Sequence, residues 1–345
     1  MKIDMVEATR LTRAGRLDEA MALLRGSAAA DPPAATGEVI DLQPPAAPAG
    51  AWTRRPAAPH RAADGAGRHQ HVGAGGRRSY RLHVPERRGD QAMPLLVMLH
   101  GCTQDAADFA AGTRMNALAG AQGIVVAWPE QPRSANGSRC WNWFRPEDQG
   151  RDRGEPALVA GITREVMARH HVDPARVYIA GLSAGGAAAV VAAIAYPELY
   201  AAVGVHSGLA RGIARDAASA FQAMAGNGPD AAAATGAARP AIVFHGDRDT
   251  TVNARNGERV LAQLRGGATL SARASNGAST GGVRYTRTDH RDGDGRVVHE
   301  HWLLHGAGHA WSGGSADGSH TDPRGPDASA EMLRFFLQHR NASAR

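Results

Sequence analysis

VYIAGLSAGG, residues 177–186, contains the pattern G-x-S-x-G between an apolar run and an alanine-rich run. The apolar run is typical of a buried strand, and the stretch 184–196 is typical of a helix. In that context Ser183 is expected on a tight strand-to-helix turn that holds its hydroxyl above the sheet. Gly181 and Gly185 would give the room that a closely packed strand and helix need. A chance turn of small residues in a chain rich in Gly and Ala is the other interpretation of the pattern.

Short apolar runs and helical segments alternate on both sides of this turn. Several of the apolar runs are continuous, as in strands that are covered on both faces. This alternation predicts an α/β fold with a mostly parallel central sheet and helices on both faces. The expected strands are 79–84, 94–100, 123–128, 177–181, 201–205, 241–246 and 297–304, and the expected helices are 105–121, 155–170, 184–196 and 327–340.

Residues suited to activate a serine follow later in the chain. A serine hydroxyl becomes a nucleophile when a base takes its proton and an acid orients that base. The acid and the base are expected in the order Ser, Asp, His, each after a later strand. Asp249, in the pattern G-x-x-D-x-x-V, is the expected acid, and Asp247 is the alternative. His309, in a loop flanked by glycines, is the expected base in preference to His305.

An acyl-transfer site also needs hydrogen-bond donors for the oxyanion that forms on the substrate. One donor is expected to be the backbone N–H of Ala184, directly after the serine. The other is expected in the loop after the strand 94–100, where the Cys102 amide is the candidate. His100, in the same loop, is interpreted as a structural histidine that hydrogen-bonds the loop.

The composition narrows the class of protein. The chain has 345 residues, of which 43% are hydrophobic and 21% charged, as in ordinary globular proteins. Its net charge is +6, but the arginines are scattered and no recognition motif accompanies them, so no nucleic-acid partner is expected. No apolar run approaches the length of a membrane span, and the first ten residues are too polar for a secretory signal. These features favour the cytoplasm, whereas a pair of cysteines is typical of an oxidising compartment, so a periplasmic or secreted location stays open.

Three zones divide the chain. Residues 1–26 predict an N-terminal amphipathic helix with an apolar stripe. Residues 27–77, rich in Pro, Ala, Gly and Arg, predict a disordered linker. Residues 78–345 are the expected catalytic domain.

Seven segments together resemble one known family. These segments, between about residues 94 and 338, resemble the esterase family of poly(3-hydroxybutyrate) depolymerases. That family is similar to the feruloyl and acetylxylan esterases of the α/β-hydrolase fold. The N-terminal EATRLTRAGRLDEAMALL also resembles the leader of depolymerase-type members. The segments are LHGCTQDAADFAAGTRMNALA, RCWNWF, RGEPALVAG, DPARVYIAGLSAGG, FHGDRDTTVN, GHAWSGG and TDPRGPDAS.

The resemblance implies a serine esterase that works without a cofactor or a metal. It carries over Ser183 as nucleophile, Asp249 as acid, His309 as base, and the amides of Cys102 and Ala184 as oxyanion donors. The implied substrate is a short-chain hydroxyalkanoate polyester or its oligomers, and a feruloyl or acetylxylan ester is the alternative. A hypothesis of another class is an idle hydrolase fold that binds a polymer granule or surface. The oligomeric state is not predicted.

The resemblance also brings the two cysteines onto loops near the active site. A disulfide between Cys102 and Cys140 would tie the oxyanion loop to the segment that carries Trp141 and Trp143; two free thiols are the alternative. Trp141, Trp143 and Trp311 are candidates for an apolar platform that binds an acyl chain, and burial in the core is the alternative for each.

Three histidines near one predicted strand invite a zinc interpretation. His299, His301 and His305 lack a metal-binding spacing such as HExxH, so they are interpreted as alternate, solvent-facing residues of a strand. No metal site is expected.

Overall fold

The computed structural model describes residues 67–73, 75–86, 89–236 and 238–343. The chain divides into two units, Met1–Ala58 and Pro59–Arg345, and the described residues all belong to the second. The helix expected in residues 1–26, and most of the expected linker, lie outside the described residues.

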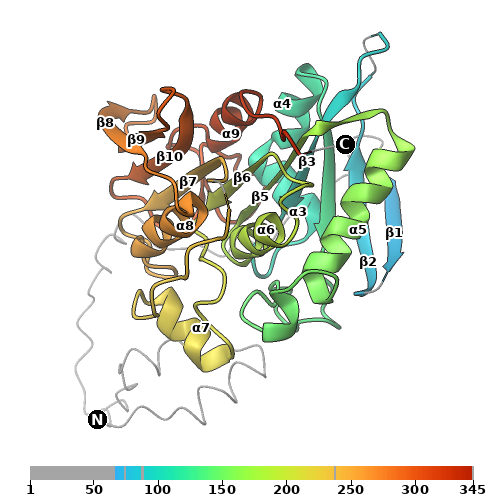
Figure 1. Ribbon diagram of the computed structural model, residues 1–345, viewed down its shortest axis with the longest axis horizontal. Helices are drawn as coiled ribbons and strands as arrows, with labels where there is room; N and C mark the ends of the chain where they lie inside the picture. The colour runs from blue at the N-terminus through green and yellow to red at the C-terminus, as the bar shows by residue number, and fades with distance from the viewer. Residues whose placement is uncertain (1–66, 74, 87–88, 237, 344–345) are drawn as a thin grey trace, which may run out of the picture. The chain divides into compact units, whose positions relative to one another are not determined.

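A ten-stranded sheet runs through the described unit, in the order β1-β2-β4-β3-β5-β6-β7-β10-β9-β8 (Figure 1). The six central strands, from β4 to β10, pair in parallel, and antiparallel strands flank them at both edges. The fold is that of an α/β hydrolase. The strands are β1 (Arg68–Gly73), β2 (Gly76–His83), β3 (Met93–Leu99), β4 (Val125–Glu130), β5 (Val172–Leu182), β6 (Ala202–His206), β7 (Ala241–Gly246), β8 (Ser271–Ala278), β9 (Arg284–Arg291) and β10 (Val297–Leu304).

Helices cover both faces of the sheet (Figure 1). Side chains of α5, α6, α7 and α8 join the core on one face, and side chains of α3, α4 and α9 join the core on the other. The helices are α3 (Ala106–Thr113), α4 (Met115–Ala121), α5 (Gly154–Arg169), α6 (Ala184–Ala195), α7 (Ala217–Met224), α8 (Arg255–Arg265), α9 (Ala328–Phe336) and the short 3-10 helix η1 (Pro146–Asp148). None of the helices in the described ranges combines the length and the apolar character that crossing a membrane requires.

The continuous apolar runs are explained by these two cores. Along β3, Leu95 and Val97 belong to one core and Leu96 and Met98 to the other, because successive side chains point to opposite faces. All four are 0% exposed, and burial of each such side chain stabilises the fold by about 1.5–3 kcal/mol. A central parallel strand therefore needs apolar residues at every position.

Two expectations about local structure are wrong. The linker was expected to reach residue 77, but β1 pairs with β2 in an antiparallel hairpin at the edge of the sheet. His71 of β1 hydrogen-bonds Glu165 of α5 at 2.6 Å, so this edge strand is fixed by a polar contact that apolar periodicity does not reveal. The helix expected over 105–121 is two helices, because Arg114 between them adopts a left-handed conformation with φ 54°.

The parallel strands end at one common edge of the sheet. Leu99 of β3 pairs with Gly181 of β5, and Leu182 pairs with His206 of β6. Polar residues at these strand ends consequently lie beside one another. Two short strands, β11 (Trp311–Ser312) and β12 (Thr321–Asp322), form a separate parallel pair.

Candidate active site

Ser183 lies at the turn between β5 and α6. Its backbone has φ 56° and ψ −120°, a conformation that costs energy for any residue with a side chain and that marks sites held by their surroundings. The Ser183 N–H donates to His206 O at 2.8 Å, which ties the turn to the neighbouring strand. The residue is 8% exposed.

The glycines on each side of Ser183 are required by close backbone contacts. A Cβ atom at Gly181 would lie 2.4 Å from the Gly185 carbonyl carbon, and one at Gly185 would lie 2.1 Å from Leu99 O. Any side chain at either position would collide with backbone, so the turn between strand and helix closes only with glycine there. The contact with Leu99 also shows that the turn packs directly against the end of β3.

Asp249 and His309 form a buried hydrogen-bonded pair. Asp249 follows β7, and its Oδ2 lies 2.6 Å from His309 Nδ1. Its Oδ1 accepts from the backbone N–H groups of Thr251 at 2.9 Å and Val252 at 2.8 Å, so all of its contacts fix one orientation. Because Nδ1 donates to the carboxylate, His309 Nε2 is left as the proton acceptor.

The charge state of Asp249 follows from its neighbours. Burial by itself raises the pKa of this carboxyl, but the adjacent His309, which hydrogen-bonds it, and the nearby His245 outweigh that effect. The pKa of Asp249 therefore lies well below its usual range, and the side chain is an anion at neutral pH.

The two alternative residues pair with each other. His305 Nδ1 lies 3.0 Å from Asp247 Oδ2, and the Gly306 N–H donates to Asp247 Oδ1 at 2.7 Å. The side chains of His305 and Asp247 are 33% and 34% exposed, whereas those of His309 and Asp249 are 8% and 0% exposed. Of these two hydrogen-bonded Asp–His pairs, the one expected from the sequence is buried.

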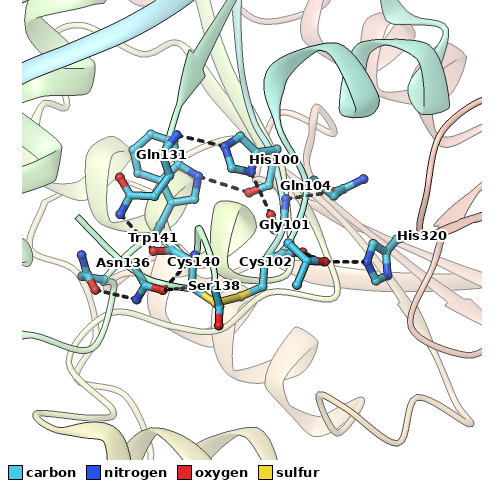
Figure 2. The surroundings of a disulfide bond; sticks show 12 residues. His100, Gly101, Cys102, Gln104, Gln131, Asn136, Ser138, Cys140, Trp141 and His320 are labelled. Atoms are coloured by element: carbon cyan, nitrogen blue, oxygen red, sulfur yellow. Dashed lines mark hydrogen bonds between the residues drawn. A yellow bond between two sulfur atoms is a disulfide. The ribbon is translucent and has the colours of Figure 1, made fainter. Parts of the chain in front are cut away.

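The loop after β3 carries the candidate oxyanion amide (Figure 2). Cys102 and Cys140 form a disulfide with an S–S distance of 2.08 Å. The N–H groups on both sides of Cys102 are occupied, since Gly101 donates to Gln104 Oε1 at 3.0 Å and Thr103 donates to Ser138 O at 2.7 Å. Within the described ranges no acceptor is found for the Cys102 N–H itself.

His100 fixes this loop through hydrogen bonds. Its Nε2 accepts from the Gln131 N–H at 3.0 Å, so Nδ1 carries the proton and donates to Gly101 O at 2.8 Å (Figure 2). Its own carbonyl accepts from Trp141 Nε1 at 3.1 Å. Complete burial lowers the pKa of His100 to about 4, which keeps the ring neutral and its Nε2 able to accept. This agrees with the structural role expected for His100.

Two buried histidines next to these residues were missed in the sequence. His206 ends β6, and its Nε2 accepts from the Ser312 N–H at 3.1 Å, which links the Ser183 turn to the segment after His309. His245 lies in β7 with Nε2 at 2.8 Å from Val252 O and 3.6 Å from Asp249 Oδ2. Burial lowers the pKa of His206 to about 3. A polar residue near the carboxyl end of a buried parallel strand is the signal that could have identified both.

Residues 78–284 match a family model described as "Esterase PHB depolymerase". The chain belongs to this family.

The names of related proteins in the comparison point to different ester substrates. Poly(3-hydroxyalkanoate) depolymerase C of Paucimonas lemoignei is 34% identical over 194 residues, which cover 53% of this chain and 46% of that protein. Feruloyl esterase B of Thermothelomyces thermophilus is 30% identical over 200 residues, which cover 53% of this chain and 67% of that protein. The chain spans about half the length of the depolymerase that it matches.

A solved structure supports the fold of this family member. The acetyl xylan esterase from Aspergillus awamori superposes with a TM-score of 0.58 and 20% identity, covering 70% of this chain and 94% of that chain. At this identity the likeness concerns the α/β-hydrolase fold alone.

The tryptophans proposed as an acyl-chain platform lie in the core of this esterase family member. Trp141 and Trp311 are 0% exposed and Trp143 is 5% exposed, so the expected platform is wrong and the core alternative describes them. Trp311 packs edge-on against Phe109 at 5.3 Å and donates from Nε1 to Ser329 Oγ at 3.0 Å. Trp141 and Trp143 belong to the core on one face of the sheet, and Trp311 belongs to the core on the other face.

The expectation of solvent-facing histidines on β10 is also wrong. His299 is 1% exposed, with Nε2 3.0 Å from Arg239 O, and the His301 Nε2 is buried as well. Burial lowers the pKa of each to about 4. The strand β10 lies inside the sheet, because β9 and β8 extend the sheet beyond it. In the ranges described, no three His, Cys, Asp or Glu side chains gather as metal ligands would.

Proposed function

We propose that this chain is a serine esterase with Ser183 as nucleophile, His309 as base and Asp249 as acid. The observation that carries the proposal is the buried Asp249–His309 hydrogen bond of 2.6 Å, at the sheet edge where the Ser183 turn also lies. His309 is tied to that turn through His206, which accepts from both Ser183 N and Ser312 N.

The proposed mechanism is a two-step acyl transfer. His309 Nε2 takes the Ser183 Oγ proton while Oγ attacks the ester carbonyl carbon, and the carbonyl oxygen becomes an oxyanion. The C–O bond to the alcohol then breaks, and the proton on His309 passes to the departing alkoxide. Water repeats the sequence on the acyl-enzyme and releases the acid. Asp249 stays ionised throughout and stabilises the imidazolium.

The oxyanion is stabilised by two backbone donors. The Ala184 N–H is the first of α6, where helix N–H groups lack internal acceptors. The Cys102 N–H is the second, and it is the one N–H among three successive residues of its loop, 101–103, for which the described structure holds no acceptor. Loss of one such donor typically raises the barrier by about 3 kcal/mol.

The proposed substrate is a short-chain hydroxyalkanoate polyester or its oligomers. The family and the 34% identical depolymerase support this choice. A plant cell-wall ester is the second candidate, because the chain covers 67% of a feruloyl esterase and only 46% of the depolymerase.

The substrate is tested by parallel assays on amorphous poly(3-hydroxybutyrate) granules, feruloylated xylan and acetylated xylan. We expect release of 3-hydroxybutyrate or its oligomers at a rate at least tenfold above the release of ferulate or acetate. Faster release of ferulate or acetate would favour the carbohydrate esters. An absence of hydrolysis on every ester, including p-nitrophenyl butyrate, would favour the idle binding protein.

A further inference from the structure

A second loop reaches the oxyanion loop from the side of the base. Trp311, two residues after His309, donates its N–H to His320 O at 2.7 Å, in the ladder that joins β11 to β12. The His320 ring then extends toward the disulfide loop, as Figure 2 shows, with Nε2 3.1 Å from Thr103 Oγ1. His320 therefore contacts both the segment that carries the base and the segment that carries the oxyanion amide.

The hydrogen atoms in this contact have one consistent arrangement. Thr103 Oγ1 lies 2.6 Å from Cys102 O, which can only accept, so the threonine hydroxyl donates to that carbonyl. The hydroxyl oxygen is then free to accept from His320 Nε2–H. The result is a directed chain from His320 through Thr103 to the Cys102 carbonyl.

Both residues hold backbone conformations that are costly for them. Thr103 has φ 68° and His320 has φ 54°. A positive φ is a genuine outlier for a β-branched residue such as Thr, and such conformations persist only where the surroundings enforce them. The Thr103 N–H donates to Ser138 O at 2.7 Å, so the peptide after Cys102 is held at its N–H and at its carbonyl.

The peptide before Cys102 is held in a comparable way. Its carbonyl, Gly101 O, accepts from His100 Nδ1 at 2.8 Å. The Cys102 side chain is fixed by the disulfide. Every group around the Cys102 N–H is thus restrained, while the N–H itself has no acceptor in the described structure.

We propose that His320 and Thr103 are positioning residues that set the orientation of the Cys102 amide in the oxyanion hole. The proposal rests on the esterase function proposed above. His320 couples the base segment to the oxyanion loop, so that the donor and the base keep a fixed relation during the reaction. Because the chain acts on a donor needed in the transition state, its loss should lower kcat and leave KM nearly unchanged.

The test uses the full chain with Thr103→Val, which removes the hydroxyl and keeps the β-branched shape. We expect kcat for p-nitrophenyl butyrate to fall about tenfold, less than the 10²–10³-fold loss of a whole oxyanion donor. KM should stay within twofold, and Thr103→Ser, which restores a hydroxyl, should recover most of kcat. The matched control is Thr286→Val on β9, since Thr286 Oγ1 donates to Asn276 Oδ1 at 2.8 Å, outside the segments that carry Cys102, His309 and His320. It should leave kcat within twofold.

A second variant and a second readout separate positioning from folding. His320→Leu should lower kcat about as much as Thr103→Val, and the double variant should be no worse than either, because both break one chain. The affinity for a trifluoromethyl ketone, which forms a tetrahedral oxyanion on the serine, should weaken in proportion to kcat, whereas thermal unfolding reports any loss of fold.

The outcomes are distinguishable. If the wild-type chain turns over the ester and Thr103→Val has the same kcat, this inference is overturned and the esterase function stands. The same holds if Thr103→Val changes only KM or only Tm. A wild-type chain without Ser183-dependent turnover would overturn the proposed function, and this inference with it.

Discussion

His309 Nδ1 lies 2.6 Å from Asp249 Oδ2, and both side chains are almost completely excluded from solvent. A few residues away, His305 and Asp247 form a similar pair at 3.0 Å with about a third of each side chain exposed. The buried pair lies next to His206 and His245, whose hydrogen bonds connect it to the Ser183 turn and to the Asp249 loop. Depth in the structure, and not residue type, distinguishes the two pairs.

Asp249→Asn should lower kcat for p-nitrophenyl butyrate by about 10⁴-fold, because His309 would lose the partner that sets its tautomer. Asp247→Asn is a matched control, since it changes the same residue type in the same loop. It should leave kcat within about threefold. Steady-state kinetics of both variants decide the assignment, and the reverse order of losses would move the acid to Asp247.

The free energy of unfolding should fall as the pH drops below 6.5. Burial lowers the pKa of His100 and His299 to about 4 and of His206 to about 3, so these groups bind protons more readily in the unfolded chain. Each lowers stability by about 1.4 kcal/mol per pH unit between its folded pKa and its ordinary value. Glu155 has the opposite effect on stability, because burial and the adjacent Asp148 raise its pKa to about 7. This carboxyl therefore binds one proton more readily in the folded chain.

Urea unfolding at pH 7.5, 6.5 and 5.5 measures this linkage. His299→Gln is the matched variant, because the amide can still donate to Arg239 O but does not titrate in this range. Its dependence of stability on pH should be smaller by about one proton. Stability that is constant or that rises from pH 6.5 to 5.5 would contradict the burial of these histidines.

A chain that begins at Arg78 should be less stable than one that begins at Gly67 by at least about 2 kcal/mol. The shorter chain lacks β1, and with it the 2.6 Å contact between His71 and Glu165 and the 2.7 Å contact between Arg68 and Glu130. Thermal unfolding distinguishes them, and equal Tm values would show that β1 contributes nothing to the fold.

The chain that begins at Gly67 also tests whether residues 1–66, which include the stretch predicted as an amphipathic helix, bind a polymer granule. Hydrolysis of p-nitrophenyl butyrate should stay within a few-fold of the full chain. A much larger loss on insoluble polymer granules is expected if residues 1–66 bind the polymer. Equal losses on both substrates would exclude a role in granule binding.

The parallel centre of the sheet could be predicted from the sequence because both of its faces are buried. The runs PLLVML and AIVF have an apolar residue at each position, which is typical of a strand that is covered on both faces. The turn at Ser183 was equally visible, because strand, glycines and helix are adjacent in the chain.

The outer elements could not be predicted in this way. β8, SARASNGA, is exposed along almost its whole length, so pairing with β9 and not burial makes it a strand. In α7 the buried residues are the small Ala220 and Ala223, which give almost no apolar periodicity. The division of helix 105–121 at Arg114 has no Gly or Pro at that position to signal it.

Within the site, long-range contacts were hidden from the sequence. Asp247 and Asp249 are both acidic residues of one loop, and only the fold shows which of them faces His309. The tryptophans were misassigned because a large aromatic residue near a catalytic motif fits a substrate pocket and a core equally well. His320 and Thr103 are 217 residues apart, and no local pattern connects them.

The most direct test of the account is the turnover of p-nitrophenyl butyrate by the wild-type chain and by Ser183→Ala. We predict measurable turnover by the wild type and a kcat about 10⁶-fold lower in the variant, with an unchanged Tm, since loss of the nucleophile leaves only the residual catalysis of the site. A folded Ser183→Ala protein with kcat within tenfold of the wild type would contradict the assignment of the nucleophile and the mechanism derived from it.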